Sequence, residues 1–397
     1  MTNDGPTPDT TLNCDLAIVG GGIAGPALAA AMADDGYRIV LIERNAGPLD
    51  TARGDHLQPI TCESLERWGV LDMMFERGAE RRLGSRWKMP DGQLVLDARV
   101  DDLSLPHPYF VYLNHELISD VLLERAAQNP GFTLLRPGTA RIVRDGVAPG
   151  RHGIVVESDG ARMQIDAPCI ALADGRSSRT RKALDIETRV HNYENPLLVL
   201  FAARTFADPR NDVHVYLTSR GVVSVVPRTG DEWKIGFPVP RTELDEWTNL
   251  SAAELSRRLS AIVPALDGIK PRVAGVYPVA MVNASRWSDG NCVWLGDACH
   301  ALHPGRSQGM NVALRSVALL AQRLRDGDLN QHVPELLADF EAHCKPAIDE
   351  RLEENHARGM DMDRIDAGVT ERMLAGLTAV AASPERSRNY RMNAAGY

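Results

Sequence analysis

The chain has 397 residues, of which 44% are hydrophobic, 24% are charged and only 5% are aromatic. This composition is typical of a globular protein with one large or two smaller domains, and the length allows a sizeable core. The net charge of −9 and the scarcity of aromatic residues argue against a nucleic-acid partner, which needs basic surface and stacking rings.

The six cysteines are scattered without a CxxC pair, which argues against a disulfide framework and a structural zinc site. The first residues, MTNDGPTPDTTLNC, have neither a basic region nor an apolar core, so we expect no signal peptide. The longest apolar runs, such as LLVLFAA at 197–203, are too short for a membrane span. We therefore expect a cytoplasmic monomer or homodimer without a membrane span.

The ordered chain begins with the pattern of a nucleotide-binding unit. The expected elements are a buried strand (16–19), the loop GGGIAG (20–25), an Ala-rich helix (26–33) and a second strand (38–42). Gly20, Gly22 and Gly25 permit a tight turn and close approach of a pyrophosphate to the helix N-terminus. Glu43, after the second strand, can accept hydrogen bonds from ribose hydroxyls. The pattern predicts an adenine dinucleotide but leaves NAD and FAD open, and the alternative is a tight turn without a ligand.

Short strands and a second nucleotide signal follow. After expected helices at 61–68 and 115–128, the Gly and Asp turns predict a meander of four strands, at 132–135, 140–144, 153–158 and 162–166. Another apolar strand at 169–173 ends in Asp174-Gly175, and a helix start follows that is crowded with basic residues. Cations are unfavourable at a helix N-terminus unless an anion lies nearby, so this cluster indicates a nucleotide. The alternative is a solvated basic face.

Residues 188–271 have the texture of an antiparallel sheet, with the runs VHVYLTS, GVVSVVP and EWKIGFP between turns. Together with residues 83–99, this sheet is expected to form the floor of a substrate pocket. Tyr216 and Ser224 are the residues that we expect to face the substrate, and the alternative is that both are ordinary sheet residues. Helices are expected at 251–265 and within 315–358, and the tail after about 385 is expected to be loose.

A third signal is VWLGDACHALHPGRSQGMNVAL at 293–314, where a strand leads through Gly296-Asp297 to a helix start at 307–309. Asp297 can accept hydrogen bonds from a polyol, and the helix start offers free backbone N–H groups. A nicotinamide enzyme needs no second loop of this kind, whereas a flavin does. His300 and His303 could be metal ligands, but no further cluster of ligand residues is evident in the sequence, so we expect no metal site.

Together the motifs GGGIAG (20–25), ADGRSSRTR (173–181) and GDACHALHPGRSQGMN (296–311) resemble those of single-component flavoprotein aromatic hydroxylases of the para-hydroxybenzoate hydroxylase type. Among these, the chain looks most similar to the short alkylquinolone, ubiquinone-precursor and tetracycline monooxygenases. The resemblance implies an α/β fold in which a discontinuous Rossmann-like FAD-binding domain (1–75, 100–187 and 272–360) carries an inserted, mostly antiparallel β-sheet substrate domain (76–99 and 188–271). A C-terminal helix and tail (361–397) complete the expected division.

The resemblance also implies residue roles. The family's ADP-binding loop, and the acidic residue that binds the ribose, correspond to Gly20, Gly22, Ile23, Ala24, Gly25 and Glu43, with Arg44 beside them. Other residues of the family that contact FAD correspond to Arg53, His115, Asp174, Gly175, Gly296 and Asp297. The Asp174-Gly175 pair is also implied in binding the pyridine nucleotide. The pyrimidine edge of the flavin and the site of oxygen activation match Pro304, Ser307, Gln308, Gly309, Met310 and Asn311. His56 is a candidate proton relay beside the flavin, and the alternative is a structural histidine.

Three positions depart from the family pattern. Ser307 replaces the first glycine of Pro-x-x-Gly-Gln-Gly, Ser316 stands where the family has Asp, and His115 stands where it has Arg. The implied reaction is hydroxylation or epoxidation of an aromatic small molecule by a flavin C4a-hydroperoxide, with FAD, NADPH or NADH, and O2. The alternatives are reduction by a partner reductase or free reduced flavin, a flavoprotein reductase, or a flavin-bound carrier or sensor.

Overall fold

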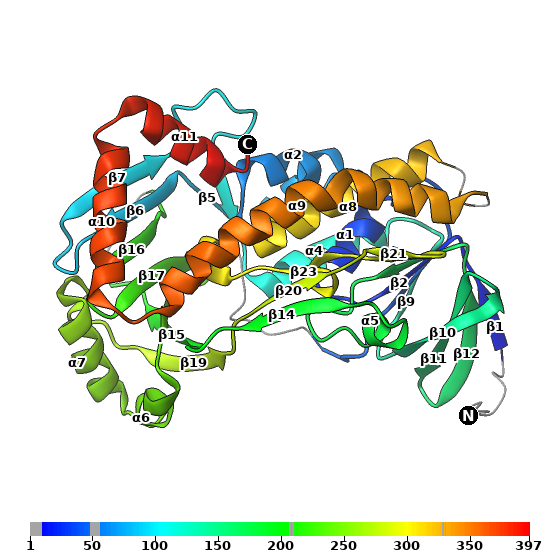
Figure 1. Ribbon diagram of the computed structural model, residues 1–397, viewed down its shortest axis with the longest axis horizontal. Coiled ribbons are helices and arrows are strands. Elements are labelled where there is room, and N and C mark those ends of the chain that lie inside the picture. Colours follow the sequence, from blue (N-terminus) through cyan, green and yellow to red (C-terminus); the bar gives the residue numbers. More distant parts are fainter. Residues whose placement is uncertain (1–9, 48–55, 206–207, 209, 328, 330) are drawn as a thin grey trace.

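The computed structural model describes residues 10–47, 56–205, 208, 210–327, 329 and 331–397. Two large sheets organise these residues, and a long helix runs past both of them (Figure 1). No helix in the described ranges is long and apolar enough to cross a membrane.

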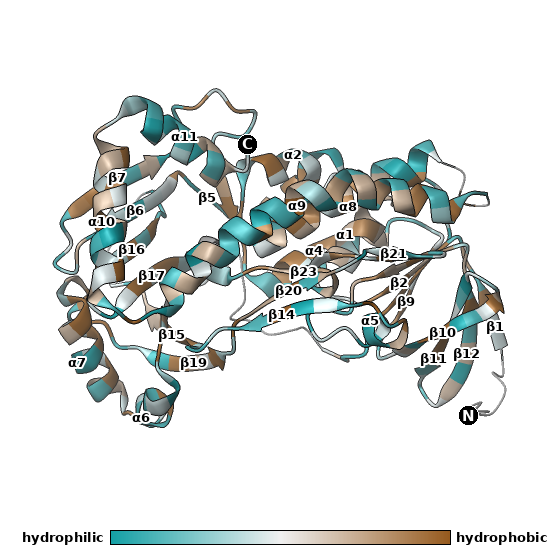
Figure 2. Cartoon of the chain, viewed as in Figure 1, coloured by the Kyte–Doolittle hydropathy of each residue, from teal (hydrophilic) through white to brown (hydrophobic). Residues whose placement is uncertain are grey.

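The first sheet has six strands and is parallel except at β21. Its order is β21 (Ser288–Asp289), β22 (Cys292–Trp294), β13 (Cys169–Leu172), β2 (Leu16–Val19), β3 (Ile39–Ile42) and β9 (Phe132–Leu135). Every residue of β2, β3 and β13 is buried, which is what a parallel sheet covered on both faces requires. In Figure 2 the region of β2 and β9 is correspondingly brown. The strands expected at 16–19 and 169–173 are confirmed within one residue.

Strand β9 corrects one expectation. Its residues were expected to begin an antiparallel meander, but β9 pairs in parallel with β3, from Ile39–Phe132 to Ile42–Leu135. The half-buried pattern of β9 carries no alternation that would reveal its partner. The remaining strands of the expected meander are confirmed: β10 (Thr139–Ala148), β11 (Arg151–Ser158) and β12 (Ala161–Asp166) are antiparallel neighbours. The unexpected strand β1 (Thr10–Asn13) pairs in parallel with β12.

Helices and the meander complete the first core. Helices α1 (Ala24–Ala31), α4 (His115–Ala126) and α8 (Gly309–Asp326) lie side by side against the parallel sheet (Figure 1). Helix α2 (Pro59–Arg67) packs against α8, α3 (Leu71–Glu76) packs against α4, and α5 (Arg179–Ala183) packs against β10. Buried residues of the parallel sheet, of α1, α4 and α8 and of the meander belong to one hydrophobic cluster. This cluster therefore fixes the three motif loops relative to one another.

The second sheet has seven strands and is antiparallel except for the β16–β6 pair. Its order is β19 (Arg272–Tyr277), β15 (Leu197–Ala203), β18 (Glu232–Pro238), β17 (Gly221–Arg228), β16 (Val213–Thr218), β6 (Gly84–Lys88) and β7 (Leu94–Arg99). The segment 83–99 thus joins the sheet as expected. Residues 272–277 also join it, although the expected division placed them with the flavin part.

The two faces of this sheet are covered by different helices. Helices α6 (Leu244–Thr248) and α7 (Ala252–Ile262), with the short turns η1 (Arg241–Glu243) and η2 (Pro264–Leu266), pack on what we call the α7 face. Helix α10 (Ala367–Ala381) packs on the opposite face, which we call the α10 face. A capping box between Ser251 and Glu254 begins α7, as its sequence pattern favours.

Two small sheets connect the six-stranded parallel sheet with the seven-stranded second sheet. One contains β4 (His56–Leu57), β8 (Phe110–Tyr112) and β5 (Glu80–Arg82), and the other contains β14 (Thr188–Asn192), β20 (Ala280–Ala284) and β23 (His300–Ala301). The third motif also forms the short turns η3 (Gly296–Ala298) and η4 (Pro304–Arg306). Its loop therefore lies where these small sheets meet the parallel sheet.

The C-terminal third is helical to its end. The helices expected within 315–358 are α8 and the 31-residue α9 (Val333–Asp363), which runs diagonally across both parts (Figure 1). The expectation of a loose tail after about 385 is wrong, because α11 (Pro384–Ala395) follows α10. Ser383 caps α11, Pro384 occupies its first turn, and Gly396 ends it with φ of 98°. These are ordinary helix signals, and the polar composition of the segment obscured them.

Candidate functional site

The glycine-rich loop after β2 is shaped by contacts that exclude side chains at two of the three glycines of its GxGxxG motif. A Cβ at Gly20, where φ is 115°, would overlap the carbonyl oxygen of Ala173, and one at Gly25 would overlap the carbonyl oxygen of Gly20. Gly22 is different, because a Cβ there would meet no described atom within 4 Å. The first and third glycines thus serve packing, and the second leaves space for a ligand at the start of α1.

Glu43 lies directly behind this loop. Its side chain is buried, and its two carboxylate oxygens accept hydrogen bonds from the backbone N–H of Gly21 at 2.6 Å and of Asn45 at 2.7 Å. Each oxygen retains a further acceptor position. Arg44, which follows it, is exposed, and Arg53 lies outside the described residues.

Helix α4 supports the same loop through a residue that sequence reasoning missed. The hydroxyl of Ser119 donates toward the carbonyl oxygens of Gly21 at 3.2 Å and Gly22 at 3.0 Å. His115, expected to contact FAD, is the first residue of α4, one helical turn before Ser119. That spacing places both residues on the same side of α4, which is the signal that could have revealed Ser119.

The second motif makes structural contacts. Asp174 accepts hydrogen bonds from the backbone N–H groups of Arg179 and Thr180 at 2.9 and 3.1 Å, and Gly175 has φ of 82°. Arg181 is buried and donates to the carbonyl oxygen of Ala298 in η3. Arg181, one of the basic residues at this helix start, therefore links the second motif to the third by a hydrogen bond and does not need a bound anion as its partner.

The third motif lies between two helices. Gly296 has φ of 58°, and a Cβ there would lie 3.3 Å from that of Ala24 on α1 and 3.4 Å from that of Ala313 on α8. Asp297 follows in η3 and is half-buried. The expected ribityl residue therefore lies beside the N-terminal turns of both α1 and α8.

Residues 303–311, which we call the flavin-facing segment after the role expected for them, lead into α8. Pro304 and Ser307 are exposed, Gln308 is buried, and Gly309 has no neighbour that a Cβ would meet within 4 Å. Helix α8 begins without a side-chain cap or an acidic residue in its first turn among the described residues. Its positive end is thus available to an anionic group.

Ser307 has left-handed backbone angles, with φ of 52° and ψ of 33°. The family has glycine at this position, and the left-handed backbone explains why, since glycine adopts that conformation without strain. We expect Ser307→Gly to raise the free energy of unfolding by about 1 kcal/mol, measured by urea denaturation of the apoprotein. Ser307→Ala keeps the strain, so equal stability of the two variants would contradict this explanation.

Asn311 joins the flavin-facing segment to β4 and α2. Its side chain is buried, and its oxygen accepts from the backbone N–H of Gln58 at 2.8 Å and the hydroxyl of Thr61 at 2.9 Å. Its amide nitrogen donates to the carbonyl oxygens of His56 and Ser307, both at 2.9 Å. Four hydrogen bonds leave this side chain no capacity to bind flavin directly, so its action on a cofactor would be indirect.

His303 joins the other end of the segment to α9. Its backbone N–H donates to the side-chain oxygen of Asn355 at 2.7 Å, and Asn355 donates back to its carbonyl oxygen at 3.2 Å. The ring of Tyr193 lies 4.7 Å from the His303 ring, and a Cβ at Gly359 would lie within 2.9 Å of both side chains. The flavin-facing segment is therefore held from two sides, by α9 and by the β4–α2 corner.

The two histidines of the third motif have separate surroundings. His300 is buried, with Trp287 at 5.1 Å between ring centroids, whereas His303 packs on Tyr193. Within the described ranges, no three His, Cys, Asp or Glu side chains gather as a metal site would require. The hydroxyl of Ser316, at the family's Asp position, lies 3.5 Å from Nε2 of His300.

Burial lowers the pKa of His214, His300 and His303 to about 4, from 6.5. These groups bind protons more readily in the unfolded chain, so the stability they confer is complete above pH 6.5 and falls as the pH drops toward 4. We expect the melting temperature to fall across this window and His300→Gln to make the fall shallower. An unchanged slope in that variant would contradict the assignment.

His56 lies between the flavin-facing segment and the second sheet. Its ring stacks on Phe110 at 4.6 Å, and burial, followed by the charges of Arg82 and Lys234, lowers its pKa to about 3. A group with this pKa is neutral at physiological pH. Its Nδ1 is enclosed and makes no hydrogen bond to any described residue. Such an atom is free to accept from or donate to a ligand, which is the chemistry that the expected proton relay needs.

Tyr216 and Ser224 lie on opposite faces of the second sheet, which corrects the expectation that both face the substrate. Val215 pairs with Ser224 and Tyr216 with Val223, so the pleat separates the two side chains. Tyr216 is 2% exposed and belongs to the hydrophobic cluster of the α7 face. Ser224 lies on the α10 face, where its hydroxyl donates to the carbonyl oxygen of Gly236 at 3.0 Å.

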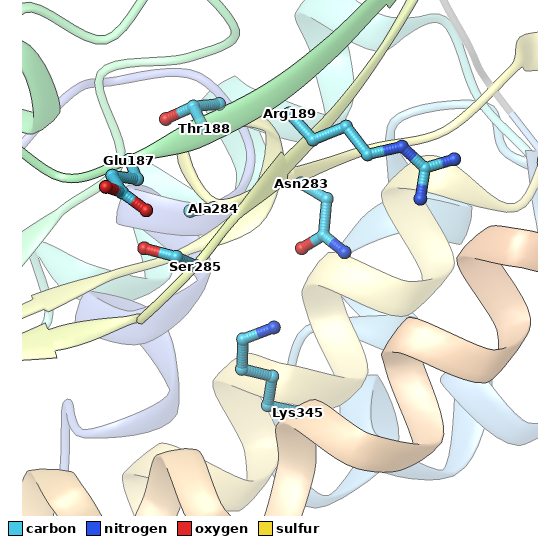
Figure 3. Close-up of a pocket in the computed structure, with 7 residues that line it drawn as sticks. All are labelled: Glu187, Thr188, Arg189, Asn283, Ala284, Ser285 and Lys345. Atoms are coloured by element: carbon cyan, nitrogen blue, oxygen red, sulfur yellow. The ribbon is translucent and has the colours of Figure 1, made fainter.

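A cavity of about 530 Å³ opens between β14, β20 and α9 (Figure 3). None of the expected site residues lines it. Its cations are already paired, because Lys345 contacts Asp349 at 2.6 Å and Arg189 contacts Glu353 at 2.5 Å. We therefore place the functional site at the three motif loops and not in this cavity.

The motif loops fit FAD as the expected ligand. The space beside Gly22 and the uncapped starts of α1 and α8 suit a pyrophosphate and an anionic ring edge. Asn114, just before α4, also has a buried side-chain oxygen without a partner among the described residues. Such an atom is expected where a polar ligand completes a site.

Comparison with known proteins identifies the family of the chain. A family model described as FAD binding domain matches residues 13–355. The chain is 28% identical to the ubiquinone hydroxylase UbiL of Rhodospirillum rubrum, over 84% of this chain and 78% of that protein. It is also 28% identical to a 6-methylpretetramide 4-monooxygenase of Streptomyces rimosus, over 85% of this chain and 82% of that protein.

Solved structures show the same fold. PqsL, a probable FAD-dependent monooxygenase from Pseudomonas aeruginosa, superposes with a TM-score of 0.77 at 25% identity, covering 93% of this chain and all (100%) of that one. The p-nitrophenol 4-monooxygenase PnpA from Pseudomonas putida superposes with a TM-score of 0.79 at 19% identity, covering 97% of this chain and 98% of that one, which shows the fold alone. The chain therefore belongs to the FAD-binding-domain family and is an FAD-dependent monooxygenase with a para-hydroxybenzoate hydroxylase-like fold.

Proposed function

We propose that this enzyme inserts one oxygen atom of O2 into an aromatic small molecule, with NADPH or NADH as the electron donor. The observation that carries the proposal is the convergence of the three motifs, since Gly20 contacts Ala173 and Gly296 lies between Ala24 and Ala313. Relatives named for ubiquinone and 6-methylpretetramide support a ring substrate.

The residues around the motif loops would hold FAD in a defined order. Gly22 and the start of α1 would bind the pyrophosphate, Glu43 the adenosine ribose, and Asp297 the ribityl chain. The flavin-facing segment would border the pyrimidine edge. When bound, FAD supplies the redox chemistry and the activation of O2, and the chain supplies orientation and electrostatics.

The protein groups around that edge have distinct tasks. The start of α8 stabilises negative charge there, because its first N–H groups point outward without an acidic residue among them. His56 stays uncharged and offers an enclosed nitrogen. The clamps on Asn311 and His303 hold the segment in place, which reduces reorganisation during the reaction.

The substrate is proposed to lie against the α10 face of the second sheet. Lys234 lies on this face with Ser224, because Val226 pairs with Lys234, and the charge of Lys234 reaches His56. This face therefore borders the β4 strand beside the flavin-facing segment. Ser224 keeps acceptor capacity for a phenol or amide, whereas Tyr216 lies on the opposite face of the sheet.

A cytoplasmic location is proposed on the state of the cysteines. All six are buried free thiols, and burial raises the pKa of Cys14, Cys62 and Cys169 to about 12. Such thiols are unreactive and suit a reducing compartment.

The test is a screen of phenols, quinolones and polyketide-like aromatics with the FAD-loaded enzyme under 18O2. We expect one compound to accelerate NAD(P)H oxidation and to yield a product carrying one labelled oxygen. Label from water, or turnover without any labelled product, would contradict oxygen insertion. Turnover only after a flavin reductase is added would keep the oxygen chemistry and replace the direct electron donor.

A further inference from the structure

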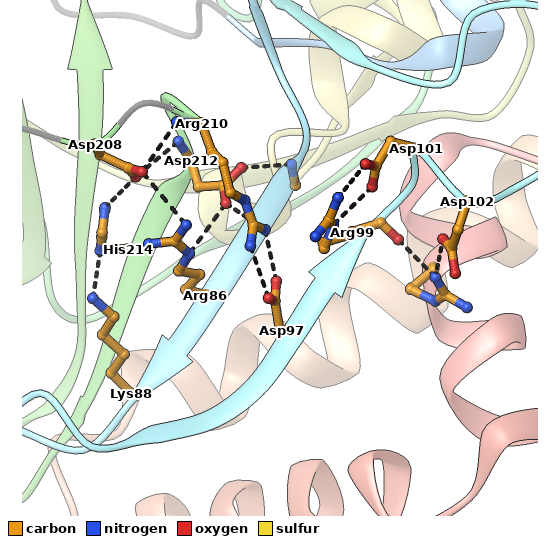
Figure 4. A network of polar contacts seen from close by, with 12 residues as sticks. Arg86, Lys88, Asp97, Arg99, Asp101, Asp102, Asp208, Arg210, Asp212 and His214 are labelled. Atoms are coloured by element: carbon orange, nitrogen blue, oxygen red, sulfur yellow. Dashed lines mark hydrogen bonds and ion pairs between the residues drawn. The ribbon is translucent and has the colours of Figure 1, made fainter.

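The last helix, α11, contacts the sheet of the second part. Arg391 donates to the carbonyl oxygen of Arg99 at 3.1 Å and pairs with Asp102. Asp102 and Arg99 lie at one end of the group of charged residues shown in Figure 4. Ala395 is fully buried with Val100 and Phe110. One side of α11 is therefore fixed to the segment that follows β7.

Neighbouring residues at the end of the chain contact α2 and Gln58, the residue that precedes it. Nε2 of Gln58 donates to the carbonyl oxygen of Ala394 at 3.0 Å, and the hydroxyl of Tyr397 donates to Glu63. A Cβ at Gly396 would overlap Ile60 and lie 3.1 Å from Oε1 of Gln58. The fit is tight enough that glycine is required there by contact as well as by its φ of 98°.

Gln58 links these contacts to the flavin-facing segment. The residue is 5% exposed, and its side-chain amide donates to the carbonyl oxygen of Ala394. Its backbone N–H donates to the side-chain oxygen of Asn311 at 2.8 Å. Asn311 in turn donates to the carbonyl oxygen of Ser307 at 2.9 Å. Three consecutive hydrogen bonds thus connect the last residues of α11 to the segment that would border the flavin.

We propose that residues 391–397 form a strap between the second sheet and α2, and that Gln58 is a positioning residue through which this strap orients the flavin-facing segment. Displacing the strap moves Gln58. The side chain of Asn311 then moves too, because it is bonded to Gln58 and has no unused donor or acceptor with which to replace that bond. The environment of bound FAD then changes. This inference rests on the proposed placement of FAD and not on the identity of the substrate.

The experiment compares Gly396→Ala with Gly376→Ala, a matched control on α10 where a Cβ would meet no described atom within 4 Å. FAD titration of each apoprotein gives the dissociation constant, and visible circular dichroism reports the surroundings of the bound flavin. We expect Gly396→Ala to raise the dissociation constant about tenfold, equivalent to about 1.4 kcal/mol, and to alter the flavin spectrum. The control should stay within about twofold of wild type.

Gln58→Glu tests the route separately and keeps the size of the side chain. It removes the donor to Ala394 and retains the backbone donor to Asn311, so we expect a change in the same direction as for Gly396→Ala. Combining it with Gly396→Ala should add little, since both act on one contact. Altered melting temperatures with wild-type FAD affinity and spectrum would overturn the proposal and leave a structural role. The readouts need no turnover, so failure to oxygenate any aromatic would contradict the proposed function alone.

Discussion

Replacing Gly22 by alanine is expected to weaken FAD binding by about tenfold or more while the free energy of unfolding of the apoprotein changes by less than about 0.5 kcal/mol. The reason is that a Cβ at Gly22 meets no described protein atom within 4 Å, so the folded chain accommodates the methyl group. The space that it fills is where the pyrophosphate would approach the start of α1. FAD titration and urea denaturation of the same preparation measure the two effects.

Gly25→Ala is the comparison that separates binding from folding. Its Cβ would overlap the carbonyl oxygen of Gly20, so the loop must deform and we expect both stability and FAD binding to be lost. Wild-type FAD affinity in Gly22→Ala would show that the ligand does not approach this glycine. A large loss of stability in Gly22→Ala would show that the second glycine also serves packing.

Asn311→Ala is expected to have the second large effect, a loss of about 3 kcal/mol in the free energy of unfolding together with weakened FAD binding. The substitution removes four hydrogen bonds and leaves three backbone groups, on His56, Gln58 and Ser307, without their partner. Because it releases the flavin-facing segment from the β4–α2 corner, the visible spectrum of the remaining bound flavin should also change.

Asn291→Ala provides a matched control away from the site. Asn291 is also buried and bonds to backbone groups, accepting from the N–H of His152 at 2.8 Å and donating to the carbonyl oxygens of His152 and Ala167. We expect it to lower stability comparably and to leave the affinity for FAD and the flavin spectrum unchanged. If both variants change the spectrum equally, the effect of Asn311 is one of global stability.

The strands that the sequence predicts best are those whose pattern has a single explanation. Residues 16–19 form a short apolar run between a polar segment and glycines, and they form β2 with those bounds. The run 213–219 alternates and is bounded by turns, and it forms β16. The pattern of residues 132–135 predicts the wrong sheet for β9, because the pairing of β9 with β3 depends on a contact distant in sequence. Register against a distant partner has no local signal.

The motif loops could be predicted because glycine positions, strand ends and helix starts are local features. The residues that hold those loops could not. Arg181 and Asn355 hold them through hydrogen bonds to backbone carbonyl or N–H groups far along the chain. Gln58 contributes its own backbone N–H, which donates to the side chain of Asn311. Any polar residue can make such bonds, so its identity indicates nothing about its partner. Tyr216 illustrates the opposite error, since alternation places it on one face without saying what covers that face.

Anaerobic stopped-flow mixing of the FAD-loaded protein with NADPH or NADH, followed by mixing with O2, tests the central claim most directly. The claim predicts that one nucleotide bleaches the flavin absorbance, faster with an aromatic ligand present, and that O2 restores it through a transient species. Oxidised flavin that neither nucleotide reduces would contradict direct electron transfer from NAD(P)H. A purified protein that binds no FAD would contradict the assignment of the three motif loops as the cofactor site.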